Sequence, residues 1–170
     1  MTDDIYPWTG NFNDLAPDDQ RAVAQLVVRG EAVAGTVDDL LARLKRARCV
    51  ALLREVGTDR IVGAAAWKQP VATYRRENFT KACAQIAGFE AAPELGYVVI
   101  APDMQGKQLS GGLVAAIAEK LTEPTFATTD SNTMRNNLER SGFSRVGGEW
   151  QGKKGLLSLW TIIPSIREGL

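Results

Sequence analysis

Histidine is absent from the 170 residues, and the two cysteines, Cys49 and Cys83, form no CxxC pair. Without histidine, Ser-His-Asp and Cys-His nucleophilic catalysis are excluded, and so is a zinc site with histidine ligands. Two separated cysteines do not resemble a disulfide framework or a zinc site either. We therefore expect no metal, and any acid–base chemistry must use Glu, Asp, Tyr, Lys, Cys or water.

Net charge and long apolar runs are missing as well. Lys+Arg and Asp+Glu each number 20, so the formal charge at pH 7 is zero. A nonspecific nucleic-acid binder usually carries a basic excess, so nucleic acid is not an expected partner. No window approaches the roughly 18 apolar residues of a membrane span, and the acidic N-terminus lacks the apolar segment of a signal peptide. These absences predict a cytoplasmic protein without a membrane partner.

The composition that remains is that of an ordinary globular protein, with 45% hydrophobic and 24% charged residues. One continuous core suffices for stability at this length, and no linker, repeat or low-complexity segment divides the chain. We predict a single α/β domain over residues 1–170.

The first half of the chain predicts two helices and a hairpin. Helical spacing runs from Pro17 through Leu26 and Ala32 or Val33 toward Gly35, and Thr36 with Asp39 predicts the start of a second helix. Apolar runs on both sides of a Gly-Thr-Asp turn predict a β-hairpin over residues 49–68, which Pro70 ends. The segment 69–93 is ambiguous: residues 74–86 fit a helix. Tyr74, Arg75 and Arg76 are interpreted as a solvated turn, with the lining of an acceptor pocket as the alternative.

The second half alternates strands and helices. Val/Ile-rich runs predict strands, and apolar residues at every fourth position predict helices. The expected elements are a strand Leu95–Ala101, a helix Leu109–Leu121, a strand Phe126–Thr129, a helix Asn132–Arg140 and one or two closing strands over Trp150–Ile163.

The loop that joins the strand Leu95–Ala101 to its helix is the most informative segment. It reads Gln105-Gly106-Lys107-Gln108-Leu109-Ser110-Gly111-Gly112. Small residues let a ligand approach the backbone closely, and the first turn of a helix offers free N–H groups and positive potential. Lys107 adds a point charge. The segment therefore predicts an anion site suited to a pyrophosphate.

In this strand, loop and helix the sequence resembles the GNAT superfamily of N-acetyltransferases. The family's signature is a β-strand, often a proline, and then Arg/Gln-x-x-Gly-x-Gly/Ala at the start of a helix. Gln105 matches the first position and Ser110 is a small residue in the last, whereas Gln108 replaces the usual glycine, where a positive φ is unfavourable. The stretch 138–143, Leu-Glu-Arg-Ser-Gly-Phe, is similar to a second family pattern. The resemblance is clear over residues 94–163.

The resemblance implies a fold and a cosubstrate. The fold is the GNAT fold, an α/β fold with a single mixed, mostly antiparallel central sheet flanked by helices on both faces. The cosubstrate is acetyl-CoA, bound without metal. For Ser131 and Asn132, plain N-capping of a helix is the alternative interpretation. The implied coenzyme contacts are Val98, Val99, Ile100, Gln105, Gly106, Lys107, Gln108, Leu109, Ser110, Gly111, Ser131 and Asn132.

Glu94 is the implied catalytic residue. In some members of the family, a strand glutamate at this spacing serves as general base, and strand N–H groups polarise the thioester carbonyl. Regular alternation would place Glu94, Gly96, Val98 and Ile100 on one face of the strand and Tyr97 on the other, in core or rim packing. The alternative for Glu94 is a strand-end carboxylate that is solvated or paired with an arginine.

The implied function is transfer of the acetyl group from acetyl-CoA to a primary amine of a small molecule or peptide, directly in a ternary complex. The tyrosine that often protonates the leaving thiolate in the family falls on Leu138, so that acid is missing from its usual place. Two alternatives stay open: a non-catalytic acyl-CoA-binding module, and an acyltransferase for a nucleic-acid-linked amine. The sequence does not identify the amine-bearing acceptor, and it leaves a homodimer open.

Overall fold

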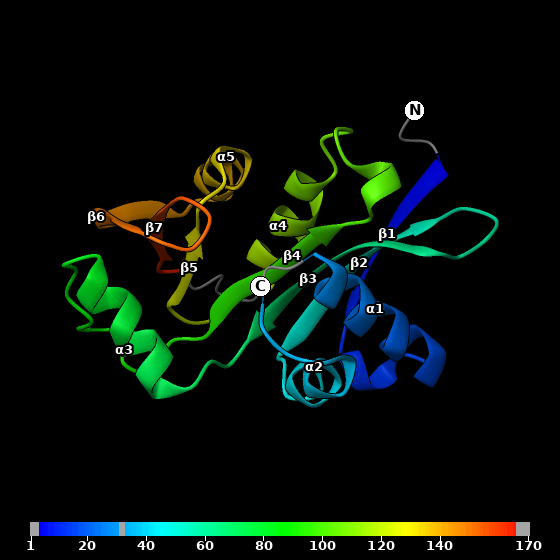
Figure 1. Ribbon diagram of the computed structural model, residues 1–170, viewed down its shortest axis with the longest axis horizontal. Helices are drawn as coiled ribbons and strands as arrows, with labels where there is room; N and C mark the ends of the chain where they lie inside the picture. Colours follow the sequence, from blue (N-terminus) through cyan, green and yellow to red (C-terminus); the bar gives the residue numbers. More distant parts are fainter. Residues whose placement is uncertain (1–3, 31–32, 166–170) are drawn as a thin grey trace. The chain divides into compact units, whose positions relative to one another are not determined.

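The computed structural model describes residues 4–30 and 33–165 (Figure 1). Ala32 and the first three residues, on which the first-helix and signal-peptide predictions partly rest, lie outside this part. The chain divides into two compact units, Met1–Lys68 with Leu95–Ile117, and Gln69–Glu94 with Ala118–Leu170. The single domain over 1–170 stays a prediction. Within the described ranges, no helix is long and apolar enough to cross a membrane.

Seven strands follow the hydrogen-bonded order β1-β2-β3-β4-β5-β7-β6. The β1/β2, β2/β3, β5/β7 and β6/β7 pairs are antiparallel, whereas β4 pairs with β5 in parallel, with Glu94 opposite Phe126. The sheet is therefore mixed and mostly antiparallel with flanking helices, which confirms the expected fold class. The strands are β1 Ile5–Gly10, β2 Cys49–Glu55, β3 Ile61–Lys68, β4 Glu94–Ile100, β5 Thr125–Thr129, β6 Ser144–Gln151 and β7 Leu156–Ile162.

Helices connect these strands. In the described ranges they comprise the short 3₁₀ turns η2 and η3 and the helices α1 to α5 (Figure 1). Their bounds are η2 Phe12–Asp14, α1 Pro17–Arg29, α2 Val37–Leu44, α3 Ala72–Lys81, η3 Pro102–Met104, α4 Ser110–Ala118 and α5 Asn132–Arg140. Each expected helix is present. Helix α5 has the predicted bounds, whereas α1, α3 and α4 end earlier than predicted.

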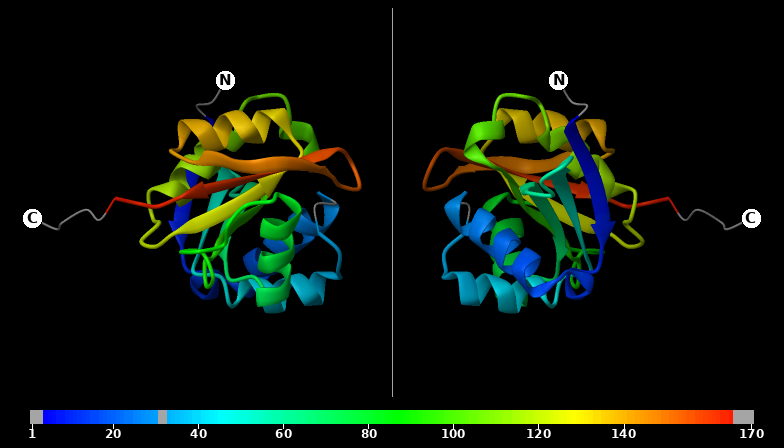
Figure 2. Two further views of the ribbon diagram at one scale, coloured as in Figure 1. Left: turned by 90° about the vertical axis from the view of Figure 1, so that its left-hand side faces the viewer. Right: turned by 90° about the vertical axis from the view of Figure 1, so that its right-hand side faces the viewer.

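In the first unit, local sequence signals start α1 and α2. Pro17 occupies the first turn of α1, and α2 has the predicted capping box: the N–H of Asp39 donates to the Thr36 hydroxyl at 3.2 Å, and the N–H of Thr36 donates to the Asp39 carboxylate at 2.9 Å. Both helices pack on β3, which is almost fully buried. Figure 2 shows them beside the strands of this unit.

Strand β4 is held by contacts on successive side chains. A Cβ atom at Gly30, just after α1, would come within 2.7 Å of Val99 Cγ2. A Cβ atom at Gly63 of β3 would lie 3.0 Å from Ile100 Cδ1 and 3.2 Å from Leu113 Cδ1 of α4. A larger side chain at either glycine would therefore collide with its neighbours. The end of β4 and the start of α4 thus pack closely against the glycine backbone.

In the second unit, the ambiguous segment 69–93 contains α3. Its Phe79 packs edge to face against Phe126 of β5, with ring centroids 5.6 Å apart, and this pair belongs to a buried cluster with Leu159 of β7. The helix ends at Lys81, earlier than predicted, and Cys83 beyond it adopts a left-handed backbone, with φ of 54°. The sequence pattern left open whether segment 69–93 forms a helix. The helix is stabilised by the packing of its apolar residue Phe79.

Strand β1 escaped prediction, and β6 was predicted only at its C-terminal end. The sequence analysis assigned no strand to Ile5–Gly10, and it started the closing strands at Trp150, whereas β6 begins at Ser144. Residues near Gly147 break the β6/β7 register, and Gly148 donates its N–H to the carbonyl oxygen of Ala82 at 2.7 Å. A strand with two adjacent glycines and an irregular register carries no clear alternation, so its pattern did not predict a strand.

Candidate functional site

A left-handed residue interrupts strand β4. Tyr97, in the middle of the strand, has a φ of 54°, which costs a non-glycine residue about 1–2 kcal/mol. The predicted regular alternation of Glu94, Gly96, Val98 and Ile100 on one face is therefore wrong across Tyr97, because a left-handed residue re-aims the side chains after it. Tyr97 itself is buried, as expected, and the Lys68 ammonium lies 4.1 Å from its ring centroid. Strain of this kind concentrates at functional sites.

Beyond β4, the chain turns through η3 into the Gln105–Gly111 loop. The amide of Gln105 donates from Nε2 to the carbonyl oxygen of Ile100 at 3.2 Å, which ties the loop back to the end of the strand. Gly106 has a φ of 80°, and a Cβ atom there would meet nothing within 4 Å. The backbone at Gly106 is thus open to a ligand, as a pyrophosphate site requires.

Gln108 adopts a left-handed backbone conformation. Its φ is 59°, although a positive φ is unfavourable for glutamine. The left-handed turn at this position is therefore kept at a cost of about 1–2 kcal/mol.

Helix α4 begins at Ser110, one residue later than predicted, and ends at Ala118 rather than Leu121. Leu113, Val114 and Ile117 are buried and fix the helix against the unit's core. Its first turn therefore presents N–H groups at the end of the loop. One strand–loop–helix segment of the first unit brings together ten predicted contacts: Val98, Val99, Ile100, Leu109, Ser110 and Gly111, which are half-buried, and Gln105, Gly106, Lys107 and Gln108, which are exposed.

The other predicted contacts, Ser131 and Asn132, belong to the second unit. Ser131 is the N-cap of α5, and its hydroxyl accepts the N–H of Met134 at 3.3 Å; Asn132 is the first helical residue and is exposed. The N-capping interpretation is therefore confirmed for Ser131. Coenzyme contact by these two residues stays a prediction.

Glu94 also lies in the second unit, where it is 3% exposed. Arg75 of α3 is 4% exposed, so it is not part of a solvated turn, and that interpretation is wrong. Its guanidinium donates to the carbonyl oxygens of Ala92 at 2.8 Å and Glu90 at 2.9 Å. Burial lowers the pKa of Arg75, and the negative charge of Glu94 opposes this shift. The negative charge of Glu94 therefore favours the charged form of Arg75 in the interior.

Leu138, the residue in the place of the family's tyrosine, is fully buried in α5. It is a core side chain that carries no proton to donate.

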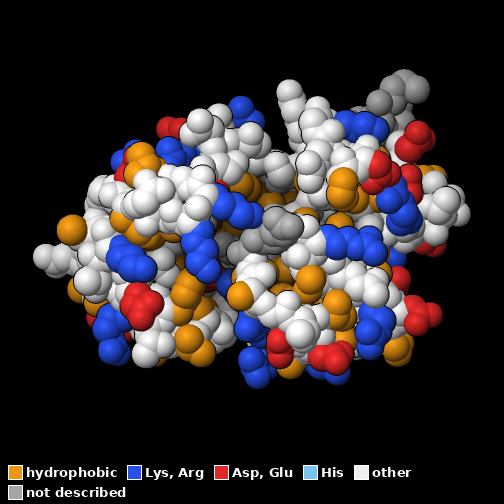
Figure 3. All heavy atoms as spheres, in the orientation of Figure 1, with side chains coloured by type: hydrophobic (Ala, Val, Ile, Leu, Met, Phe, Trp, Pro, Cys, Tyr) orange, Lys and Arg blue, Asp and Glu red, His pale blue; other side chains and the backbone are white. Residues whose placement is uncertain are grey.

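In the described ranges, no group of three or more His, Cys, Asp or Glu side chains is arranged to hold a metal ion. On the face drawn in Figure 3, basic and acidic side chains are interspersed.

The sequence analysis missed two features of this region. It had no signal for the left-handed Tyr97, because tyrosine is an ordinary strand residue. It also had no signal for an ion pair that joins Asp103 of η3 to Arg60, just before β3, at 2.6 Å. Such a contact between distant positions leaves no trace in local spacing.

These features, a mixed seven-stranded sheet with flanking helices and a strand β4 that leads through a left-handed loop into α4, define the fold of the GNAT acetyltransferases. Neither a family sequence model nor a curated protein matches the chain. The GNAT fold that the sequence resemblance implies is confirmed by solved structures of that fold.

Three such structures illustrate the similarity. A GNAT-family acetyltransferase from Streptococcus agalactiae is 11% identical, with a TM-score of 0.66 over 94% of this chain and 96% of its own. An acyl-CoA N-acyltransferase from Pseudomonas aeruginosa is 14% identical, with a TM-score of 0.62 over 92% and 98%. The ribosomal-protein-S18-alanine N-acetyltransferase from Escherichia coli is 12% identical, with a TM-score of 0.60 over 97% and 99%. At these identities the similarity is one of fold.

Proposed function

We propose that this protein is an acetyl-CoA-dependent N-acyltransferase that transfers an acetyl group to a primary amine in a ternary complex. The observation that carries the proposal is the succession of left-handed residues, Tyr97, Gly106 and Gln108, between an interrupted β4 and the start of α4. Two of these are not glycines, so the conformation is maintained against its local cost. The fold shared with acyl-CoA N-acyltransferases supports the same reaction class.

The loop is suited to the pyrophosphate of the coenzyme. The backbone at Gly106 is open, α4 supplies N–H groups and positive potential at its first turn, and Lys107 supplies a mobile positive charge. These are three independent contributions to anion binding, and all of them come from one continuous segment. Bound acetyl-CoA would supply the acyl group as a thioester.

The strand contributes polarisation of the acyl carbonyl. A left-handed residue turns the following peptide units away from the regular ladder, which leaves backbone N–H groups for a ligand. In the proposal, the N–H groups of Val98 to Ile100 donate to the thioester oxygen as negative charge develops there. Their half-buried position, between Tyr97 and the loop, favours this use.

Glu94 is our proposed base. An acceptor amine is protonated near pH 7, and it must lose a proton before it attacks. In the proposal, the Glu94 carboxylate accepts this proton, directly or through a water molecule. Because Leu138 replaces the tyrosine, the thiolate of the coenzyme leaves without an acid from α5; a free thiol has a pKa of about 8.5, so water can protonate it.

The acceptor is an amine of a small molecule or a peptide. The Escherichia coli enzyme of this fold acts, by its name, on an alanine of ribosomal protein S18, which supports a peptide amine as one class. A cytoplasmic location, the lack of a membrane or nucleic-acid partner, and the open question of a homodimer stay predictions from the sequence.

Calorimetric titration with coenzyme A and mass spectrometry of acetyl-CoA turnover against an amine panel test the proposal together. We expect saturable coenzyme binding and an acetylated amine. Coenzyme binding without any turnover would instead favour the non-catalytic acyl-CoA-binding module, and no binding at all would refute both. Salt-dependent binding of RNA or DNA would point to a nucleic-acid-linked acceptor.

A further inference from the structure

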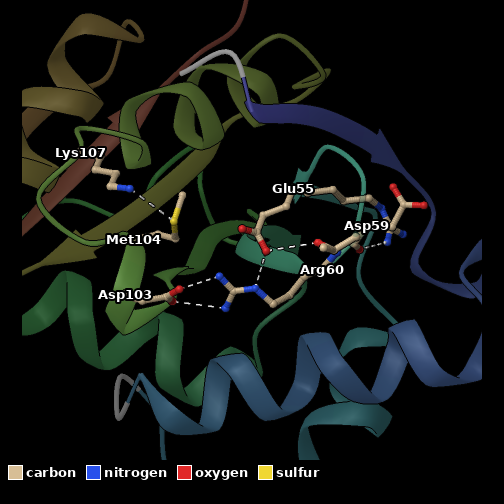
Figure 4. A network of polar contacts seen from close by, with 8 residues as sticks. Glu55, Asp59, Arg60, Asp103, Met104 and Lys107 are labelled. Atoms are coloured by element: carbon tan, nitrogen blue, oxygen red, sulfur yellow. Dashed lines mark hydrogen bonds and ion pairs between the residues drawn. The ribbon is translucent and has the colours of Figure 1, made fainter. Parts of the chain in front are cut away.

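An ion-pair network lies beside the proposed coenzyme loop, in the first unit (Figure 4). Arg60, at the turn between β2 and β3, donates from Nε to Glu55 Oε1 at 2.6 Å. It also donates from Nη1 to Asp103 Oδ1 at 3.3 Å and from Nη2 to Asp103 Oδ2 at 2.6 Å. One guanidinium therefore bridges two carboxylates and engages Asp103 with both of its terminal nitrogens, which is the strongest geometry for such a pair.

Asp103 occupies the middle of η3, directly between β4 and the loop. The β2/β3 hairpin thus contacts η3 through the side chain of Arg60. A backbone hydrogen bond adds to this contact, because Ala101 donates its N–H to the carbonyl oxygen of Val62 in β3 at 2.8 Å. The loop itself is exposed from Gln105 to Gln108 and has little packing of its own. Its position depends on the residues that precede it.

The network also sets the charge beside the loop. Hydrogen bonding and charge from Arg60, with a smaller contribution from Lys107, lower the pKa of Asp103, so the Asp103 carboxylate is ionised and compensated mainly by Arg60. Lys107 Nζ lies 3.8 Å from the Met104 sulfur. If Arg60 were removed, the charge of Asp103 would remain next to the anion site and would compete for Lys107.

We propose that Arg60 is a positioning residue for coenzyme binding: through Asp103 it fixes η3 and the start of the loop, and it leaves Lys107 available to the pyrophosphate. The inference rests on the proposed function for the identity of the ligand. Arg60 thus has two separable effects. It fixes the position of η3, and it compensates the charge of Asp103 that would otherwise attract Lys107.

The expected magnitude is moderate. The side chains of Arg60 and Asp103 are 45% and 59% exposed, and isolated surface ion pairs contribute little. Three features increase the expected effect above that of an isolated ion pair. Arg60 contacts Asp103 through two nitrogens, it also contacts Glu55, and its removal leaves the charge of Asp103 uncompensated. We expect Arg60→Ala to weaken coenzyme A binding about three- to tenfold, and to raise KM for acetyl-CoA by a similar factor with little change in kcat.

Three variants separate the two effects. In Arg60→Ala, amide hydrogen exchange of residues 101–109 in the free protein should speed up, together with the loss of affinity. In the double variant Arg60→Ala/Asp103→Ala, affinity should recover in part, because the uncompensated charge is gone, whereas exchange should stay fast. Arg54→Ala is the control for the hairpin as a whole: it removes another ion pair, with Asp19 at 3.0 Å, and a hydrogen bond to the carbonyl oxygen of Asp59 at 3.2 Å, without contact to Asp103.

Unchanged exchange and unchanged coenzyme A affinity in Arg60→Ala would overturn the inference, and so would an equal loss in Arg54→Ala, which would assign the effect to general weakening of the hairpin. If the unaltered protein bound no coenzyme A, the proposed function would be wrong and the ligand part of the inference with it. Exchange of residues 101–109 would then still report whether Arg60 holds the loop.

Discussion

Glu94 and Arg75 are both almost fully buried in the second unit of the protein, and the negative charge of Glu94 raises the pKa of Arg75 against the opposing effect of burial. Glu94 is therefore not a solvated strand-end carboxylate. The base role remains a proposal, and the two residues are tested separately.

The base proposal is tested with Glu94→Gln. We expect kcat/KM for acetyl transfer to fall by about 10²–10⁴-fold, because glutamine cannot accept the proton of the amine. The matched control is Glu90→Gln, which alters an exposed carboxylate of the same segment and should retain activity. Steady-state rates across pH 6–9 provide the measurement, and transfer by Glu94→Gln that equals the unaltered enzyme over this range would refute the assignment.

Arg75→Ala should lower the free energy of unfolding by about 3–5 kcal/mol, because it removes the charge that opposes Glu94 and leaves three backbone carbonyls without their donor. The neighbouring Arg76 is exposed, so Arg76→Ala should change stability by no more than about 0.5 kcal/mol. Urea unfolding of both variants makes the comparison. Equal stabilities would mean that the Arg75 contacts contribute nothing net.

Gln108→Gly should stabilise the protein by about 0.5–1 kcal/mol, since glycine adopts a φ of 59° without steric cost. Lys107 is a neighbouring exposed residue without a left-handed backbone, so Lys107→Gly should instead destabilise by a similar amount. Thermal unfolding of the two variants reports the difference. A lower Tm for Gln108→Gly would contradict the left-handed assignment.

Gly106→Asp should weaken coenzyme A binding by about tenfold or more, because it places a negative charge against the pyrophosphate. The control is Gly106→Asn, which has nearly the same shape, tolerates a φ of 80° equally well and carries no charge. Calorimetric titration of both compares them at equal backbone strain. Equal affinities would show that the pyrophosphate does not lie at this glycine.

The Arg60 network predicts a pH dependence. Arg60 lowers the pKa of both Asp103 and Glu55, chiefly through hydrogen bonds to their carboxylates. A carboxylate with a lowered pKa contributes its full stabilising free energy at pH values above its usual pKa. It loses that free energy as the pH falls through the lowered value. The difference in coenzyme A affinity between the unaltered protein and Arg60→Ala should therefore be constant from pH 8 to pH 5. A difference that vanished at pH 5 would exclude the carboxylates as its source.

Local sequence signals accounted for much of the fold. Thr36 and Asp39 predicted a capping box, Pro70 predicted the end of β3, and the apolar positions of α4 predicted a helix. These features depend on neighbours within a few positions, so composition and spacing reveal them. The order of the elements and the glycine-containing loop then led to the fold class and to the candidate coenzyme site.

The sequence by itself predicted strand β4 and the candidate anion-binding loop, and it showed the missing histidine and the leucine in the place of the family's tyrosine. Only the tertiary structure decided the left-handed turns at Tyr97 and Gln108, the burial of Arg75 and the contact between Arg60 and Asp103, which are 43 positions apart. A side chain's burial and its backbone strain depend on which distant segments pack against it. Those contacts arise when the chain folds, and no local pattern encodes them.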